Sequence, residues 1–228
     1  MSRLCLILFG APGSGKGTQA KLLKQVLALP HISTGDMLRE RVAMRDQLGL
    51  EVAGLLQSGA LVPDQTVNAL VADRIEWPDC LPGFILDGYP RTVSQAAILV
   101  GVLKARQIAT VVVHLKVDYN VIVARLAGRR QCPVCGALYS LSPNAPTVSE
   151  VCDYDGSKLV VRDDDREEVV TERLRAYDRQ TAPVLKFFAD GGIDCWDVDG
   201  AGPGGPQAIA KRIQALLREK FGPVGSAN

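Results

Sequence analysis

The stretch GAPGSGKGTQ, residues 10–19, decides the fold of this chain of 228 residues. It directly follows the apolar run LCLILF at residues 4–9, and its spacing is Gly10-x4-Gly15-Lys16. A strand, a glycine-rich turn and the start of a helix, in this order, place main-chain N–H groups around an anion, and the lysine adds a positive charge. A tight strand-to-helix turn alone would not need that lysine. The stretch therefore predicts a phosphate-binding loop, or P-loop.

The residue after the lysine departs from the usual P-loop pattern. Most P-loops have a Ser or Thr there whose hydroxyl binds Mg²⁺, whereas this chain has Gly17, with Thr18 one position later. Mg²⁺ would then depend on phosphate oxygens, water and a carboxylate from another segment. Asp87 is the natural candidate, because it ends the apolar run GFILDG at residues 83–88.

Short apolar runs alternate with helix-like stretches along the chain, which predicts an α/β fold with a parallel β-sheet core flanked by helices. The expected strands are residues 4–9, 29–33, 83–88, 110–117 and 193–198. The expected helices begin at Lys16, Thr34, Pro63, Thr92, Asn120, Arg166 and Pro206. The helix that begins at Arg166 is expected to continue to residue 189, with acidic residues in its first turn as the helix dipole favours.

Two regions interrupt the alternation. Residues 34–63 are helix-like and contain no strand, and residues 130–163 are rich in Pro, Ser and Gly with short β-like pieces. We interpret both as insertions at the carboxyl edge of the sheet, where open α/β sheets bind their ligands. Residues 223–228 are expected to form a flexible tail.

Composition excludes several classes of function. The chain is 47% hydrophobic and 22% charged, with a formal net charge of +1 and only 5% aromatic residues. A nucleic-acid partner bound through a basic, aromatic-bearing face is therefore not expected. The N-terminal apolar run is too short for a signal peptide or a membrane span, so we expect no membrane partner and a cytoplasmic location. The scattered Cys5, Cys80 and Cys195 fit buried hydrophobic positions.

The other three cysteines form a pattern typical of a metal site. Cys132-x2-Cys135 is separated by a short loop from Cys152-x2-Asp155, and two such pairs can present four ligands to one tetrahedral ion. A disulfide is the weaker alternative in a reducing compartment. Asp155 has the spacing of the fourth ligand, and Asp153 remains a competitor. Four protein ligands would make the metal structural, with Zn²⁺ expected and Co²⁺ or Fe²⁺ possible.

Four segments together resemble the adenylate kinases. They are GAPGSGKGTQA at 10–20, HISTGDMLR at 31–39, GFILDGYPRT at 83–92, and GRR at 128–130 followed by RDDDREEVVTERL at 162–174. The resemblance covers roughly residues 4–200. It implies a P-loop core (1–33, 64–128 and 163–222), a helical insertion for the nucleoside monophosphate (34–63) and a small β-rich, metal-bearing lid (129–162). The implied activity is reversible phosphoryl transfer, ATP + AMP = 2 ADP, with Mg²⁺, by a monomer.

The resemblance also implies roles for individual residues. ATP would be bound by Gly13, Ser14, Gly15, Lys16, Gly17, Thr18, Arg125, Arg129, Leu138 and Tyr139. AMP would be bound by Thr34, Arg39, Ala60, Leu61, Val62, Gly88, Tyr89, Pro90, Arg91, Gln95, Arg162 and Arg173. The catalytic residues would be Lys16, Arg91, Arg129, Arg162 and Arg173, and Asp87 would hold Mg²⁺ through water. Phosphoryl transfer fits such a set, because it depends mainly on positioning and on neutralising negative charge.

Three other functions remain alternatives to an adenylate kinase. A kinase for UMP or CMP would share the design, but Thr34 and Gln95 together suit the amino and ring nitrogens of adenine. A nucleic-acid-binding zinc protein would need a more basic chain. A P-loop regulator would not need the second base pocket that GFILDGYPRT implies. One departure from the family pattern is Asp163, an acidic residue directly after Arg162, which is expected to weaken the attraction for ATP or alter lid closure.

Overall fold

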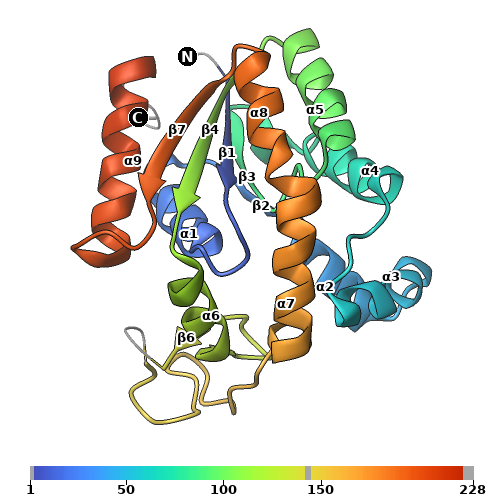
Figure 1. The fold of residues 1–228 in the computed structure, drawn as a ribbon, viewed down its shortest axis with the longest axis vertical. Coiled ribbons are helices and arrows are strands. Elements are labelled where there is room, and N and C mark those ends of the chain that lie inside the picture. Colours follow the sequence, from blue (N-terminus) through green and yellow to red (C-terminus); the bar gives the residue numbers. More distant parts are fainter. Residues whose placement is uncertain (1–2, 142–144, 223–228) are drawn as a thin grey trace.

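A parallel sheet of five strands forms the centre of the fold, as expected for the α/β class (Figure 1). The structure is a computed structural model that describes residues 3–141 and 145–222. The residues expected to form a flexible tail, 223–228, lie outside the described residues. The strands are β1 Leu4–Phe9, β2 His31–Ser33, β3 Gly83–Asp87, β4 Ala109–Lys116, β5 Arg129–Gln131, β6 Leu138–Ser140 and β7 Asp194–Asp199. Their order in the large sheet is β2-β3-β1-β4-β7.

Helices cover both faces of this sheet. The α-helices are α1 Lys16–Leu27, α2 Thr34–Met44, α3 Gln47–Ser58, α4 Asp64–Arg74, α5 Val93–Ala105, α6 Tyr119–Ala127, α7 Glu167–Ala176, α8 Pro183–Asp190 and α9 Gly205–Phe221. Short 3₁₀ turns occupy η1 Pro78–Cys80 and η2 Asp163–Asp165, and a π-helical turn, η3, occupies Tyr177–Thr181. All seven expected helix starts lie within one residue of an observed start.

Alternate residues of the central strand β1 enter two separate cores. Leu4, Leu6 and Leu8 pack against α1 and α9, whereas Cys5, Ile7 and Phe9 pack toward α4, α5 and α8. Both sets are nearly inaccessible to solvent. A strand buried on both faces must be apolar throughout, which is why LCLILF shows no polar alternation. Cys5 and Cys80 are buried as expected, and Cys195 is half-buried.

The two interrupting regions lie outside the large sheet. The first carries α2 and α3, which are separated by Arg45 and by Asp46, whose side chain caps α3 by accepting from the Gly49 N–H. The second carries the antiparallel pair β5–β6 and isolated bridges at Val160 and Val151 instead of further strands. Figure 1 shows α2–α3 and the β5–β6 region on the two sides of the sheet's carboxyl edge.

The helix expected over residues 166–189 is interrupted, so this expectation was wrong in part. It consists of α7, the π turn η3 and α8, which continues roughly in the direction of α7 (Figure 1). The physical cause is Pro183, which has no N–H to donate within the helix. The main-chain N–H of Ala182 donates instead to the Tyr177 carbonyl oxygen at 2.8 Å, five residues back. This wider turn brings Thr181 to the sheet edge.

No helix within residues 3–141 and 145–222 has both the length and the apolar composition needed to cross a membrane.

Candidate active site

The loop between β1 and α1 has the conformation of a phosphate-binding loop. Gly13 and Gly15 have φ angles of 83° and 99°, which only glycine adopts without strain. These left-handed residues turn successive main-chain N–H groups toward one side, at the N-terminus of α1. The Lys16 ammonium closes the loop by donating to the carbonyl oxygens of Gly10 at 2.8 Å and Ala11 at 2.9 Å. The loop can therefore receive an anion and supply a mobile positive charge to it.

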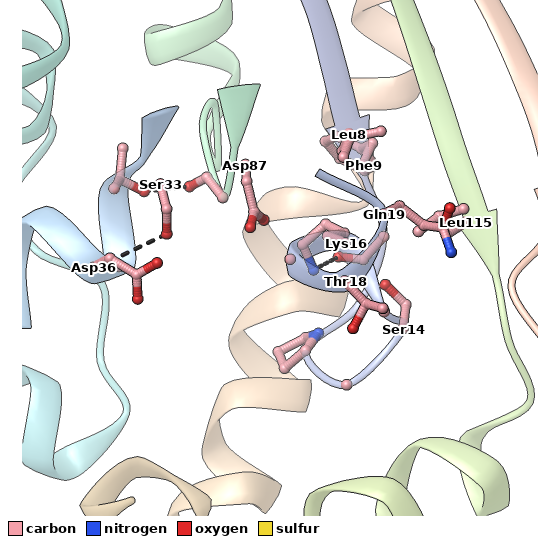
Figure 2. A pocket seen from close by; sticks show the side chains of 18 of the residues that line it. Leu8, Phe9, Ser14, Lys16, Thr18, Gln19, Ser33, Asp36, Asp87 and Leu115 are labelled. Carbon is pink, nitrogen blue, oxygen red and sulfur yellow. Dashed lines mark hydrogen bonds between the residues drawn. The ribbon is translucent and has the colours of Figure 1, made fainter. Parts of the chain in front are cut away.

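The missing hydroxyl at position 17 is explained by what lies opposite. A Cβ on Gly17 would approach Oδ2 of Asp87 to 3.3 Å, closer than most such contacts, so the glycine lets that carboxylate lie against the start of α1. Asp87 ends β3, and its Oδ2 lies 3.2 Å from Nε2 of His31 on the neighbouring strand β2. Figure 2 shows Asp87 and Lys16 facing each other across the pocket. A carboxylate beside a phosphate loop has the donor chemistry that Mg²⁺ prefers.

A cavity of about 820 Å³ extends from the P-loop to α2, α5 and the β5–β6 region. Every residue assigned to ATP, AMP or Mg²⁺ from the sequence lines this cavity. The described structure thus brings together residues between positions 13 and 173 in the sequence at one sheet edge. The geometry shows proximity, while the role of each residue remains a prediction.

Six arginines converge on this cavity from separate elements. They are Arg39, Arg91, Arg125, Arg129, Arg162 and Arg173. So many like charges in a partly buried site repel one another, and removal from water further disfavours the charged form of each arginine. Removal from water, with Arg39 and Arg129 nearby, lowers the pKa of Arg162 to about 10. Such a cluster has the positive charge and the hydrogen-bond donors to receive a polyanion.

Two aspartates that the sequence reasoning passed over hold several of these arginines in place. Arg173 donates from Nη1 to the main-chain carbonyl of Asp164 at 2.6 Å and to Oδ1 of Asp165 at 3.0 Å. Arg129 lies 3.4 Å from the same Asp165 carboxylate, and Arg39 lies 3.5 Å from that of Asp164. Removal from water alone would raise the pKa of Asp164, but the positive charges of Arg173 and Arg39 hold it below its usual value. The Asp164 carboxylate therefore stays ionised, and the hydrogen bonds and ion pairs of both aspartates order the arginines.

Asp163 occupies a different environment from its two acidic neighbours. Its residue is exposed, and it is not among the residues that line the cavity, whereas Asp164 is. Its main-chain carbonyl accepts a hydrogen bond from Nε of Arg166. An exposed charge is screened by water and salt, so its effect on a phosphate in the cavity is expected to be small. The expectation from the sequence, that Asp163 weakens the attraction for ATP or alters lid closure, stays a prediction, and the exposed position favours a small effect on ATP.

Arg91 differs from the paired arginines. Its Nε donates to the Gly88 carbonyl at 2.8 Å, and its own carbonyl accepts from the Thr181 hydroxyl at 2.9 Å. Among the described residues, no carboxylate lies within ion-pair distance of its guanidinium. Removal from water, with Arg173 next, lowers its pKa to about 10. Arg91 is thus a half-buried, charged side chain that is available to an external anion.

The cavity continues on the α2–α5 side as a second pocket. Thr34 and Gln95 are each 2% exposed, and the Thr34 hydroxyl donates to the Gly88 carbonyl at 2.9 Å. Ala60, Leu61, Val62 and Tyr89 line the same region. Apolar walls with a few fixed polar groups are typical of a pocket that binds an aromatic base.

A glycine-rich segment after β7 also lines the cavity, and the sequence reasoning missed it. Arg125 donates from Nη2 to the Gly200 carbonyl at 2.9 Å, and Gln19 donates from Nε2 to that of Pro206 at 3.0 Å. The run GAGPGGP at residues 200–206 follows the last strand at the same carboxyl edge as the P-loop. A glycine-rich run directly after a strand at this edge is the sequence signal that could have identified the segment.

The cysteine-rich segment forms two equivalent turns. In the first, the Gly136 N–H donates to the Cys132 carbonyl and the Cys132 N–H donates to that of Ala137. In the second, Gly156 donates to Cys152, and Cys152 to Ser157, with the same spacing. Asp155 therefore occupies in the second turn the place that Cys135 has in the first.

The ligand atoms of Cys132, Cys135, Cys152 and Asp155 all lie within 4.8 Å of one another. Three sulfurs and one oxygen so close together fit a tetrahedral ion such as Zn²⁺. The Ser157 main-chain N–H donates to Asp155 and, as the main cause, holds the pKa of that carboxylate well below its usual value. The competitor Asp153 instead accepts from the Thr147 N–H at 2.8 Å and is not in the cluster. The geometry favours Asp155 as the fourth ligand.

Comparison with known proteins agrees with this geometry. The sequence model of the family "Adenylate kinase" matches residues 8–193. An adenylate kinase of Anaeromyxobacter sp. (strain K) is 45% identical over 213 residues, which covers 92% of this chain and 99% of that protein. One of Pseudothermotoga lettingae is 46% identical over 185 residues, 81% of this chain and 85% of that protein. One of Acholeplasma laidlawii is 43% identical over 216 residues, 94% and 98% respectively.

Proposed function

This chain belongs to the adenylate kinase family, and from that premise we propose that it catalyses the reversible, Mg²⁺-dependent reaction ATP + AMP = 2 ADP. It is a nucleoside monophosphate kinase, a phosphotransferase. The observation that carries the proposed reaction is the single continuous cavity, which has a phosphate loop on one side and a second base pocket on the other. The converging arginines lie on its walls, where the phosphates of two nucleotides would meet.

The P-loop would bind the ATP phosphates, with its N–H groups around them and Lys16 on the terminal groups. Arg91 and Arg39 would bind the AMP phosphate, and Arg129, Arg162 and Arg173 would lie against the phosphoryl group in transfer. A guanidinium fork binds two phosphate oxygens at once, so these arginines both orient the groups and offset the negative charge. Because the transferred group needs little covalent help, this positioning supplies most of the catalysis.

Mg²⁺, when bound with ATP, would neutralise phosphate charge, and Asp87 would hold it through water. Asp87, at the end of β3, lies against the start of α1, where Gly17 leaves space for its carboxylate, and its Oδ2 contacts Nε2 of His31. The aspartate therefore compensates for the hydroxyl that the P-loop lacks.

The helical segment 34–63 is proposed to close over AMP, and segment 129–162 over ATP. Closure of both would exclude water from the transferred phosphoryl group and so limit hydrolysis. The Cys132, Cys135, Cys152 and Asp155 cluster would hold a structural Zn²⁺ that folds the lid, with Co²⁺ or Fe²⁺ as substitutes. Thiolate ligands suit a reducing compartment, so we propose a cytoplasmic enzyme, active as a monomer.

Wild-type enzyme is expected to phosphorylate AMP much faster than UMP, CMP or GMP in a coupled assay with ATP and Mg²⁺. The physical reason is the pair Thr34 and Gln95, both buried in the second pocket, whose hydroxyl and amide suit the amino and ring nitrogens of adenine. Initial rates with each monophosphate at equal concentration would measure this preference. Equal rates with UMP and AMP would contradict the base assignment and favour a pyrimidine nucleotide kinase.

ATP binding is expected to take up protons near pH 8. Removal from water, opposed by Asp87 and reinforced by Arg91, lowers the pKa of Lys16 to about 8 in the free enzyme. Bound phosphates favour the charged lysine, so the pKa rises on binding and the lysine gains a proton. Calorimetry in two buffers of different ionisation heat would measure the uptake.

The uptake should vanish near pH 6, where Lys16 is protonated with or without ATP, and in the Lys16→Met variant at any pH. Uptake that persists in the Lys16→Met variant would assign the proton to another group.

A further inference from the structure

Asp64 lies behind the second base pocket, at the first residue of α4. It does not line the cavity itself. Its Oδ1 accepts a hydrogen bond from Nε2 of Gln95 at 2.8 Å, and its Oδ2 accepts one from the Thr92 hydroxyl at 2.7 Å. Its hydrogen bond to the Gln95 amide therefore connects its carboxylate to the cavity.

The Gln95 amide is held on its other side as well. Its Oε1 accepts from the main-chain N–H of Arg91 at 2.7 Å. A carboxylate can only accept hydrogen bonds, and a main-chain N–H can only donate. If the amide rotated by half a turn, its oxygen would face the carboxylate and its NH₂ group would face the N–H. Both contacts would be repulsive, so Gln95 has one allowed amide orientation.

This fixed amide retains one N–H and one acceptor lone pair for a ligand. Adenine presents an amino donor next to a ring-nitrogen acceptor, whereas guanine presents an oxygen acceptor and an N–H donor at the same two positions. The two bases thus have opposite hydrogen-bond order on this edge. An amide that could rotate would form hydrogen bonds with either base, whereas an amide with a fixed orientation can form both hydrogen bonds with only one of them.

We propose that Asp64 is a positioning residue that sets the base specificity of the monophosphate site. It does so by fixing the orientation of the Gln95 amide, which then selects a 6-aminopurine and rejects a 6-oxopurine. The inference rests on the proposed function, since it assumes that the pocket of Thr34 and Gln95 binds the monophosphate base. The rejection is an electrostatic mismatch built into the site rather than a lack of space.

The same hydrogen bonds also stabilise the fold, and an experiment must separate the two effects. Asp64 lies in the first turn of α4, where a negative charge interacts favourably with the helix dipole. The Thr92 hydroxyl caps α5 by accepting from the Gln95 N–H at 3.1 Å. Loss of either residue could lower the melting temperature without any effect on base choice.

The Asp64→Asn variant keeps the shape of the side chain but can turn either an oxygen or an NH₂ group toward Gln95. We expect the preference for AMP over GMP, measured as a ratio of kcat/KM values and as a ratio of calorimetric Kd values, to fall about tenfold. One correct bidentate base contact discriminates against the wrong base by ~5- to 150-fold. The change should arise both from weaker AMP binding and from stronger GMP binding. An unchanged ratio in a folded Asp64→Asn enzyme would overturn the inference.

Three further variants serve as controls. Asp73→Asn makes the same charge change on the exposed part of α4 and should leave the ratio unchanged. Thr92→Val removes the α5 cap and the hydrogen bond to Oδ2 of Asp64 but leaves both partners of the Gln95 amide, so it should lower the melting temperature and retain the ratio. Asp64→Glu keeps an acceptor-only group and should retain more of the ratio than Asp64→Asn, even if the asparagine variant folds poorly.

If Thr92→Val reduces the ratio as much as Asp64→Asn does, general loosening is the cause and the inference is wrong. Wild-type enzyme that fails to phosphorylate AMP would instead refute the proposed function, so the two failures can be told apart.

Discussion

Replacing Arg91 by methionine is expected to lower kcat/KM for AMP phosphorylation by ~10³-fold or more, by analogy with the loss of an arginine that stabilises a transferring phosphate. Arg91 is a cavity arginine whose guanidinium donates to a main-chain carbonyl at 2.8 Å and, within the described part of the chain, has no carboxylate within ion-pair distance. Its positive charge is therefore available to a phosphate. Steady-state kinetics with AMP and ATP varied separately would measure the loss.

The loss should not come from unfolding. Removal from water and the nearby Arg173 lower the pKa of Arg91 to about 10. The charged form of Arg91 is therefore less stable in the free protein than it would be in water. Removing that charge relieves repulsion, so the melting temperature of the Arg91→Met variant should be no lower than that of wild type. An enzyme that becomes inactive without becoming less stable is what a functional charge predicts.

Two companions sharpen the test. Arg91→Lys keeps the charge but not the planar fork, so it should recover only part of the activity. Arg175→Met removes an exposed arginine on α7, two residues beyond Arg173, and should retain wild-type kinetics. If Arg91→Met were as active as Arg175→Met, Arg91 would not be part of the catalytic machinery.

Much of the fold could be predicted from the sequence, because its features are local. The apolar run at 4–9 is buried on both faces and so has no polar alternation, and the glycines of the P-loop have positive φ angles. The π turn at Tyr177–Thr181 was not predicted, although Pro183 is visible in the sequence. A proline predicts that a helix is disturbed, but whether it ends, kinks or widens depends on tertiary contacts such as that of Thr181 with Arg91.

The residues expected to contact a ligand could be predicted from the sequence, because they lie in motifs. The contacts between side chains within the site could be predicted less well. The cavity arginines stand out in motifs, whereas their partners Asp164 and Asp165 were seen only as part of an acidic run. The contact between Asp64 and Gln95 joins residues 31 apart in the sequence, on two different helices. No local pattern reports such a pair, because only the packing of α4 beside α5 brings it together.

Replacing Cys152 by serine is expected to abolish metal binding in the lid and to lower the melting temperature by about 10 °C. The lid core consists of Cys132, Tyr139, Cys152 and Leu159, with Ala137 against it, which is too few buried side chains for independent stability. Two of its four members are themselves ligand candidates, so the metal and the core are one structure. A loss of ~3–5 kcal/mol at such a site corresponds to roughly 6–20 °C in a chain of this size.

Mass spectrometry would measure the metal content, and thermal unfolding would measure the melting temperature. Turnover well below the melting temperature should fall much less than either of these. Cys195→Ser makes the same atomic change at a half-buried position in β7, outside the cluster, and should affect neither metal content nor lid stability. Asp155→Asn should lose the metal, while Asp153→Asn should keep it, because Asp153 accepts from the Thr147 N–H instead. Retention of a full metal equivalent by Cys152→Ser, or loss of turnover at unchanged stability, would contradict a structural role, since four protein ligands leave the ion no position for a substrate.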